Sequence, residues 1–266
     1  MLNANRNASL TKIYLLPNTL TAGNLFFGFL CIIRCIQAKY CNEGAVSAEL
    51  YNQAVWCIFG ALVCDGLDGR VARLSGRESL FGIEFDSLAD IISFGLAPAM
   101  IVFFLILSPE NNFPFFKRIG WLIGFIYLLC GAVRLARFNV THHPLLPKDQ
   151  RPSSPNSVFV GLPIPAAASV IASLVLVINQ FDLKAFAICL PFLMLLIAWL
   201  MISNVYYPSF KHLDWTTETK LIAFVIIIST LAILALFKGL SFFILSITYV
   251  FYGLIHHVRH KKPLQN

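Results

Sequence analysis

Residues 88–107 read LADIISFGLAPAMIVFFLIL, a run of twenty residues in which Asp90 is the one charged side chain. An α-helix needs about 20 apolar residues to cross the hydrocarbon core of a membrane. Outer-membrane β-barrels instead use short segments in which apolar and polar residues alternate, and this run does not alternate. The stretch therefore predicts a membrane-spanning helix.

The composition of the whole chain agrees with a membrane protein. Of its 266 residues, 58% are hydrophobic and 12% are charged, whereas an ordinary soluble domain carries roughly 25% charged residues. The same balance excludes an intrinsically disordered chain, which requires low hydrophobicity and high net charge. The predicted fold class is all-α, a polytopic membrane helical bundle.

Eight apolar runs, separated by charged or turn-forming residues, are candidate membrane spans. No long soluble segment interrupts them, so we expect one membrane domain over residues 1–266, with six spans in residues 1–205 and two additional spans in residues 206–266. The predicted spans are 19–39, 48–64, 88–107, 119–137, 163–180, 184–203, 220–237 and 239–258.

Lys and Arg residues are unevenly distributed between the predicted loops. Fourteen fall on the side that holds both termini and five on the other side, while Arg34 lies inside the first span. Because positive residues concentrate in cytoplasmic loops, we expect both termini in the cytoplasm and the protein in the plasma membrane, which is the inner membrane in a bacterium. No basic cluster is interleaved with aromatic residues in a soluble domain, so we expect no nucleic-acid partner.

Acidic residues are concentrated before and at the start of the 88–107 run. Six of the thirteen Asp and Glu residues lie between positions 65 and 90. If the second span continues as helix, Asp65 and Asp68 are i,i+3 neighbours, and Asp86 and Asp90 are i,i+4 neighbours. Four carboxylates that converge at a membrane boundary repel one another unless a cation holds them together. An oxygen-only set without His or Cys favours Mg²⁺ or Mn²⁺ over zinc.

Other residues of this segment fit phosphate chemistry. Gly69 lies one turn after the first aspartate, where the missing side chain leaves room for a ligand. Arg73 can pair with phosphate oxygens, and Asp90 can accept a proton from an attacking hydroxyl within hydrogen-bond reach. The alternative interpretation is a solvated surface network between these acids and Arg70, Arg73 and Arg77.

The segment also carries a motif, D-x-x-D-G-x-x-A-R-x(8)-G-x-x-x-D-x-x-x-D, between positions 65 and 90. At every fixed position it resembles the CDP-alcohol phosphotransferase family. The resemblance implies a membrane enzyme in which a hydroxyl displaces CMP from a CDP-linked lipid or alcohol with divalent metal, expected here as two ions of Mg²⁺ or Mn²⁺. It implies Asp90 as the general base. The implied metal ligands are Asp65, Asp68, Asp86 and Asp90. The implied contacts to the CDP-lipid are Gly69, Arg73 and Ser79.

Three further segments resemble the branch of this family whose acceptor is serine. They are residues 17–24 (PNTLTAGN), 134–139 (RLARFN) and 161–167 (GLPIPAA), and the likeness covers roughly the first 205 residues. It implies CDP-diacylglycerol and L-serine as substrates, phosphatidylserine and CMP as products, membrane lipids as surroundings, and a homodimer.

Five residues outside the aspartate motif are weaker candidates. Asn18 and Thr21 lie one turn apart at the start of the first span and either contact the CDP-lipid or cap the helix. Arg134 and Arg137 end the fourth span and either bind the carboxylate of serine or anchor the protein at lipid headgroups. Asn139 is a candidate for the polar groups of the acceptor.

Two alternatives remain open from the sequence. The same chemistry with glycerol 3-phosphate or inositol phosphate would require additional cations for the acceptor's phosphate. A cation transporter would use intramembrane acids along an ion path, but the acids here cluster at one membrane face.

The last two spans carry no acidic residue and are expected to serve packing or oligomerisation.

Overall fold

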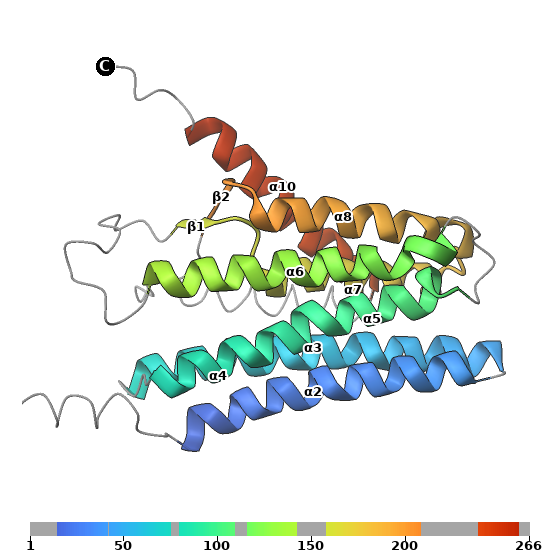
Figure 1. Ribbon diagram of the computed structural model, residues 1–266, viewed down its shortest axis with the longest axis horizontal. Helices are drawn as coiled ribbons and strands as arrows, with labels where there is room; N and C mark the ends of the chain where they lie inside the picture. The colour runs from blue at the N-terminus through green and yellow to red at the C-terminus, as the bar shows by residue number, and fades with distance from the viewer. Residues whose placement is uncertain are drawn as a thin grey trace, which may run out of the picture.

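The computed structural model describes residues 15–41, 43–75, 80–109, 116–142, 158–208 and 239–260, which form a bundle of helices (Figure 1). Two π-helical segments, η1 (Ile91–Leu96) and η2 (Phe103–Leu107), flank the short helix α5 (Ala97–Val102), and a 3-10 helix, η4 (Lys184–Ile188), precedes α8. The remaining helices are α2 (Leu15–Tyr40), α3 (Gly44–Ser75), α4 (Leu80–Asp90), α6 (Phe116–His142), α7 (Ile164–Gln180), α8 (Cys189–Ile202) and α10 (Gly239–His260).

Long apolar helices dominate the described part of the chain. Four stretches are long and apolar enough to cross a membrane, namely Asn18–Tyr40, Leu80–Leu107, Arg118–Thr141 and Ala185–Ile202. Two shorter apolar helices are Ile164–Gln180 and Gly239–Ile255. The predicted helical membrane bundle is thereby confirmed in kind. The prediction of eight spans goes beyond these four, and the predicted span 220–237 lies outside the described residues.

The helices that carry the acidic motif extend beyond the predicted spans. Helix α3 continues to Ser75, well past the predicted limit at residue 64. The next helix begins at Leu80, eight residues before the predicted start of the third span. Each aspartate pair therefore lies on continuous helix, because the polar end of a spanning helix continues beyond the apolar stretch from which a span is predicted.

Helix α4 continues into α5 through the widened π turn η1, which begins directly after Asp90. Two polar contacts bind this turn to its neighbours: the Ser93 hydroxyl donates to the Asn24 carbonyl of α2 at 2.9 Å, and the Tyr127 hydroxyl of α6 donates to the Phe94 carbonyl at 3.0 Å. A Cβ at Gly28 would overlap Ser93, so glycine permits the close approach of α2. π turns occur frequently at functional sites.

A short antiparallel pair of strands departs from the all-α prediction. Strand β1 (Val158–Val160) precedes α7 and pairs with β2 (Tyr206–Pro208), which follows α8, with Phe159 opposite Tyr207. Gly161 follows β1 with φ +81°, a backbone conformation that side chains rarely adopt. Arg137 of α6 donates to the carbonyls of Val160 and Ile202 at 3.0 and 3.3 Å. These contacts tie the start of α7 to the end of α8.

The last helix is an integral part of the bundle. Helix α10 contacts α7 and β2, and its Phe242 ring lies 4.4 Å from the Phe59 ring of α3, centroid to centroid. Gly239 abuts Leu176 of α7. Small residues at such crossings let helix backbones approach closely in a membrane, so the expected packing role agrees with the position of α10.

Candidate active site

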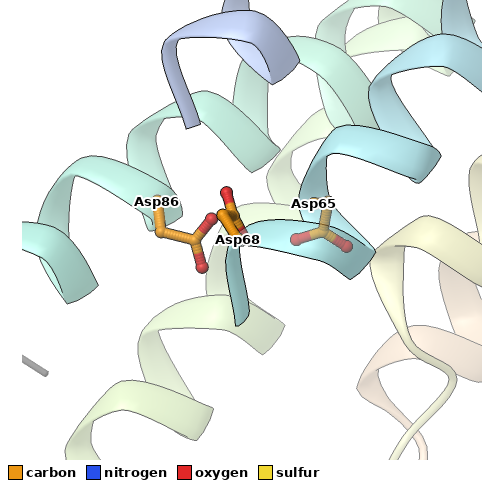
Figure 2. Close-up of side chains that lie close together, drawn as sticks. All are labelled: Asp65, Asp68 and Asp86. Carbon is orange, nitrogen blue, oxygen red and sulfur yellow. The ribbon is translucent and has the colours of Figure 1, made fainter. Parts of the chain in front are cut away.

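Three of the predicted aspartates converge at the end of the bundle where α2 begins, α3 ends and α4 begins (Figure 1). Asp65 and Asp68 on α3 lie opposite Asp86 on α4 (Figure 2). One carboxylate oxygen from each lies within 4.8 Å of the other two. The i,i+3 spacing within α3 and the early start of α4 together produce this cluster.

The environment of the cluster favours a bound cation. Asp68 is only 4% exposed, and the Oδ1 atom of Asp86 is enclosed and has no hydrogen-bond partner among the residues that the structure describes. Burial, and then the charge of Asp68, raise the pKa of Asp65, which lies beyond the predicted 48–64 span, to about 7. Ionised carboxylates are therefore costly here unless a cation compensates them. Three carboxylate oxygens match the ligand preference of Mg²⁺ and Mn²⁺.

Polar residues of α2 form a stripe over the aspartates at a spacing of three. The Thr21 hydroxyl donates to Asp68 Oδ2 at 2.9 Å, and Asn24 Nδ2 donates to Asp90 Oδ1 at 3.0 Å. Asn18 Nδ2 is enclosed, and no other described residue forms a hydrogen bond with it. Because α2 already begins at Leu15, Asn18 and Thr21 lie inside the helix, and the helix-cap alternative is wrong.

Asp90 lies outside the cluster of three carboxylates. It is 8% exposed, follows Asp86 by one turn of α4, and interacts electrostatically with Asp65 and Asp86. Its partner Asn24 was not predicted as a site residue. Continuing the Asn18 and Thr21 spacing by three more residues would have identified it, because positions three apart share a helix face.

The two predicted arginines of α6 differ in their surroundings. Arg134 is 6% exposed, and its Nε atom is enclosed with no hydrogen-bond partner in the described part of the chain. Its charge interacts with Asp90 and with Tyr249 of α10. Arg137 instead donates to backbone carbonyls near β1 and α8, and to Asn204 Oδ1 at 3.4 Å. Arg134 thus interacts with the charge of Asp90, whereas Arg137 is hydrogen-bonded beside the strand pair.

The remaining predicted residues are Asn139, Gly69, Arg73 and Ser79. Asn139 Nδ2 donates to Ser87 Oγ at 2.8 Å, and both line a groove of about 350 Å³ between α4 and α6. Gly69 lies in α3, one turn after Asp65. Arg73 belongs to the same helix, but its side chain lies outside what the structure describes, as does the whole of Ser79.

Comparison with known proteins now adds to this geometry. A family model whose description is CDP-alcohol phosphatidyltransferase matches residues 14–206. The chain belongs to this family. As a CDP-alcohol phosphatidyltransferase it is a transferase and an integral membrane protein, and the family is divalent-metal dependent. The resemblance predicted from the aspartate motif is confirmed.

Relatives from bacteria and archaea are similar along most of the chain. The CDP-diacylglycerol--serine O-phosphatidyltransferase of Helicobacter pylori (strain ATCC 700392 / 26695) is 37% identical over 249 residues, 92% of each chain. The protein of the same name from Methanocaldococcus jannaschii is 33% identical over 205 residues, 76% of this chain and 83% of the relative. The archaetidylserine synthase of Methanothermobacter thermautotrophicus is 33% identical over 210 residues, 78% and 76% of the two chains.

Proposed function

We propose that the protein transfers the phosphatidyl group of CDP-diacylglycerol to the hydroxyl of L-serine, producing phosphatidylserine and CMP. The observation that carries this proposal is the cluster of Asp65, Asp68 and Asp86 beside the buried Asp90. It occurs in a chain whose relatives over 92% of its length are named for this reaction. Serine as the acceptor also agrees with the three sequence segments that resemble the serine branch.

Asp65, Asp68 and Asp86 would hold Mg²⁺ or Mn²⁺, expected as two ions, and we keep Asp90 as a further candidate ligand. When bound, the metal neutralises the pyrophosphate and the charge that develops on the leaving CMP. Thr21 supports this role, because its hydrogen bond to Asp68 Oδ2 restricts that carboxylate to one orientation.

Asp90 is the proposed general base. Asn24 binds Oδ1 of this carboxylate, which leaves Oδ2 to take the proton of the serine hydroxyl. The serine oxygen then forms a bond to the phosphorus that bears the lipid, and the bond from that phosphorus to the CMP oxygen breaks. Direct attack agrees with the absence from the sequence motif of a Ser or Cys with an adjacent base.

Substrate contacts are assigned to two groups of residues. For the CDP-lipid, the enclosed and unpartnered Nδ2 of Asn18 supports a contact with a ligand. For the acceptor, the buried guanidinium of Arg134 beside Asp90 is better placed than Arg137, which is bonded to carbonyls. The full CDP-lipid set is Gly69, Arg73, Ser79, Asn18 and Thr21. The full acceptor set is Arg134, Arg137 and Asn139.

We further propose eight spans, with residues 1–205 as the family core and residues 206–266 as two additional spans. β2 adjoins the start of α7, whereas Gly239 abuts Leu176 in the last third of α7. The connection over 209–238 thus links two ends of one spanning helix, which supports a crossing at 220–237. The positive-charge asymmetry supports a cytoplasmic active site in a plasma membrane. The proposal that the protein is a homodimer rests on the family resemblance. Crosslinking in native membranes tests this proposal.

CMP release by the purified protein in detergent tests the proposed reaction. CDP-diacylglycerol is supplied with Mn²⁺ or Mg²⁺, and serine, glycerol 3-phosphate and inositol phosphate are offered separately, with a chelated control. We expect release with serine, and loss of release on chelation. If CMP is released with glycerol 3-phosphate or inositol phosphate but not with serine, serine is the wrong acceptor. No release with any acceptor would contradict the proposal and favour cation transport, which uptake by proteoliposomes measures.

A further inference from the structure

Two buried polar groups lie outside the metal cluster, one on α6 and one on β2. The Nε of Arg134 on α6 and the phenolic oxygen of Tyr207 on β2 are both enclosed, and neither has a hydrogen-bond partner in the part of the chain that the structure describes. Arg134 is 6% exposed and Tyr207 is 0% exposed. Buried polar atoms are nearly always hydrogen-bonded in native proteins, so we expect a bound ligand to supply the missing partner of each atom.

Tyr249 of α10 connects these two groups. Its ring lies 5.9 Å from that of Tyr207, centroid to centroid, at an interplanar angle of 32°. Its phenol interacts electrostatically with Arg134. The three side chains come from α6, β2 and α10, and Tyr249 is the residue that interacts with both of the others.

The chemistry of this group selects an anion. A guanidinium offers only donors, and a phenol offers one donor. A carboxylate accepts from both, and charge-assisted hydrogen bonds of this kind are among the strongest in proteins. An ammonium group would be repelled by Arg134. The charge of Arg134 also interacts with Asp90, so an anion held here lies on the side of the proposed base.

We propose that Tyr207 and Tyr249 join Arg134 to form the subsite for the carboxylate of the acceptor, and that α10 thereby determines acceptor specificity. This inference rests on the proposed function. In serine the hydroxyl is separated from the carboxylate by two carbon atoms, so a carboxylate bound at the three residues directs the hydroxyl toward Asp90. The two tyrosines lie beyond residues 14–206, the segment that matches the family model.

The surroundings keep the subsite in place. A Cβ at Gly253 would overlap the ring of Tyr207, so the close approach of α10 to β2 depends on glycine at this position. Phe242, near the other end of α10, packs on Phe59 and on Trp56, with centroid distances of 4.4 and 5.7 Å. Helix α10 therefore packs closely on the bundle near both of its ends, which pre-organises the subsite for binding.

The test uses the full-length enzyme with Tyr207→Phe, Tyr249→Phe and the double variant. Phenylalanine retains the ring and removes only the phenolic oxygen. Tyr252→Phe, on the same helix but 52% exposed, is the matched control. We expect KM for serine to rise about tenfold per phenol, as for loss of a hydrogen bond to a charged group, with KM for CDP-diacylglycerol unchanged and the control like wild type.

A second readout separates binding of the carboxylate from a structural effect. Ethanolamine is serine without the carboxylate, so the preference of wild type for serine over ethanolamine, measured as the ratio of kcat/KM values, should fall in the tyrosine variants. An unchanged ratio, or equal rises in KM for serine and the CDP-lipid, would overturn the subsite.

Failure of the proposed function is distinguishable from failure of the subsite. If wild type releases CMP with glycerol 3-phosphate rather than serine, the proposed acceptor is wrong. The subsite is then judged by KM for that anionic acceptor in the same variants: a rise supports it and no change overturns it. If the wild-type protein releases no CMP with any of the three acceptors, both proposals are overturned.

Discussion

The two sides of Asp90 differ in the charge that they collect. On the side of α2, α3 and α4, three carboxylates gather within 4.8 Å, and one of them, Asp68, accepts a hydrogen bond from Thr21 of α2. On the side of α6, β2 and α10, the buried Nε of Arg134 and the buried phenolic oxygen of Tyr207 have no hydrogen-bond partner among the described residues. The first side matches a cation and the second an anion. Asp90 interacts electrostatically with Asp65 and Asp86 of the first side and with Arg134 of the second, as a base that serves both sides requires.

Removing one carboxylate of the metal side should have the largest effect. Asp86→Ala takes away the α4 ligand, so we expect turnover to fall by about 10³-fold or more, the scale of electrostatic stabilisation at a reacting phosphate. Binding of Mn²⁺, followed by the EPR signal of the free ion, should weaken in parallel. Glu84→Ala, at an exposed acid on the same helix, is the control. Wild-type Mn²⁺ binding by Asp86→Ala would remove this residue from the metal side.

Asp90→Asn tests whether the residue between the two sides is a base. Asparagine keeps the shape of the side chain and an oxygen that can accept from Asn24. We expect turnover to fall by about 10²-fold, the lower range for a general base, while Mn²⁺ and CDP-lipid binding are largely retained. An active variant would show that another group takes the proton. A variant that also loses Mn²⁺ would show that Asp90 is chiefly a ligand.

Asn24→Ala removes the donor that orients Asp90. We expect kcat to fall about tenfold with little change in either KM, because one hydrogen bond to a charged group is lost. The control is Asn179→Ala, which breaks a comparable Asn–Asn contact to Asn52, 3.0 Å in length, elsewhere in the bundle. Equal losses of activity in the two variants would indicate a general effect on helix packing, not a positioning role.

Gly253→Ala should produce the smallest change and confine it to the acceptor side. The added methyl displaces the Tyr207 ring, and overpacking of this kind is moderately destabilising, so we expect KM for serine to rise roughly fivefold with Mn²⁺ binding intact. Gly124→Ala is the control, since its Cβ would make an ordinary 3.8 Å contact with Ala99. A loss of Mn²⁺ affinity in Gly253→Ala would show that the two sides are not separable.

The metal side could be predicted largely from sequence, and the acceptor side could not. Asp65 and Asp68 are spaced within α3, and Asp86 and Asp90 within α4, and such spacings are set by helix geometry. The role of Asn24 depends on how α2 crosses η1, which the Gly28 and Ser93 contact controls. No local periodicity encodes that crossing.

The amino-acid sequence by itself determined the helical membrane bundle, the family and the choice of aspartates as candidate metal ligands. Hydrophobic length and residue spacing are properties of one or two helices, so they can be recognised without the tertiary structure. Tertiary structure alone decided that Asn24 binds Asp90, that Arg137 is bonded to carbonyls near β1, and that Tyr249 interacts with both Tyr207 and Arg134. These relations join residues separated by many tens of positions. They follow from close packing between helices, where glycine at a crossing determines which side chains meet.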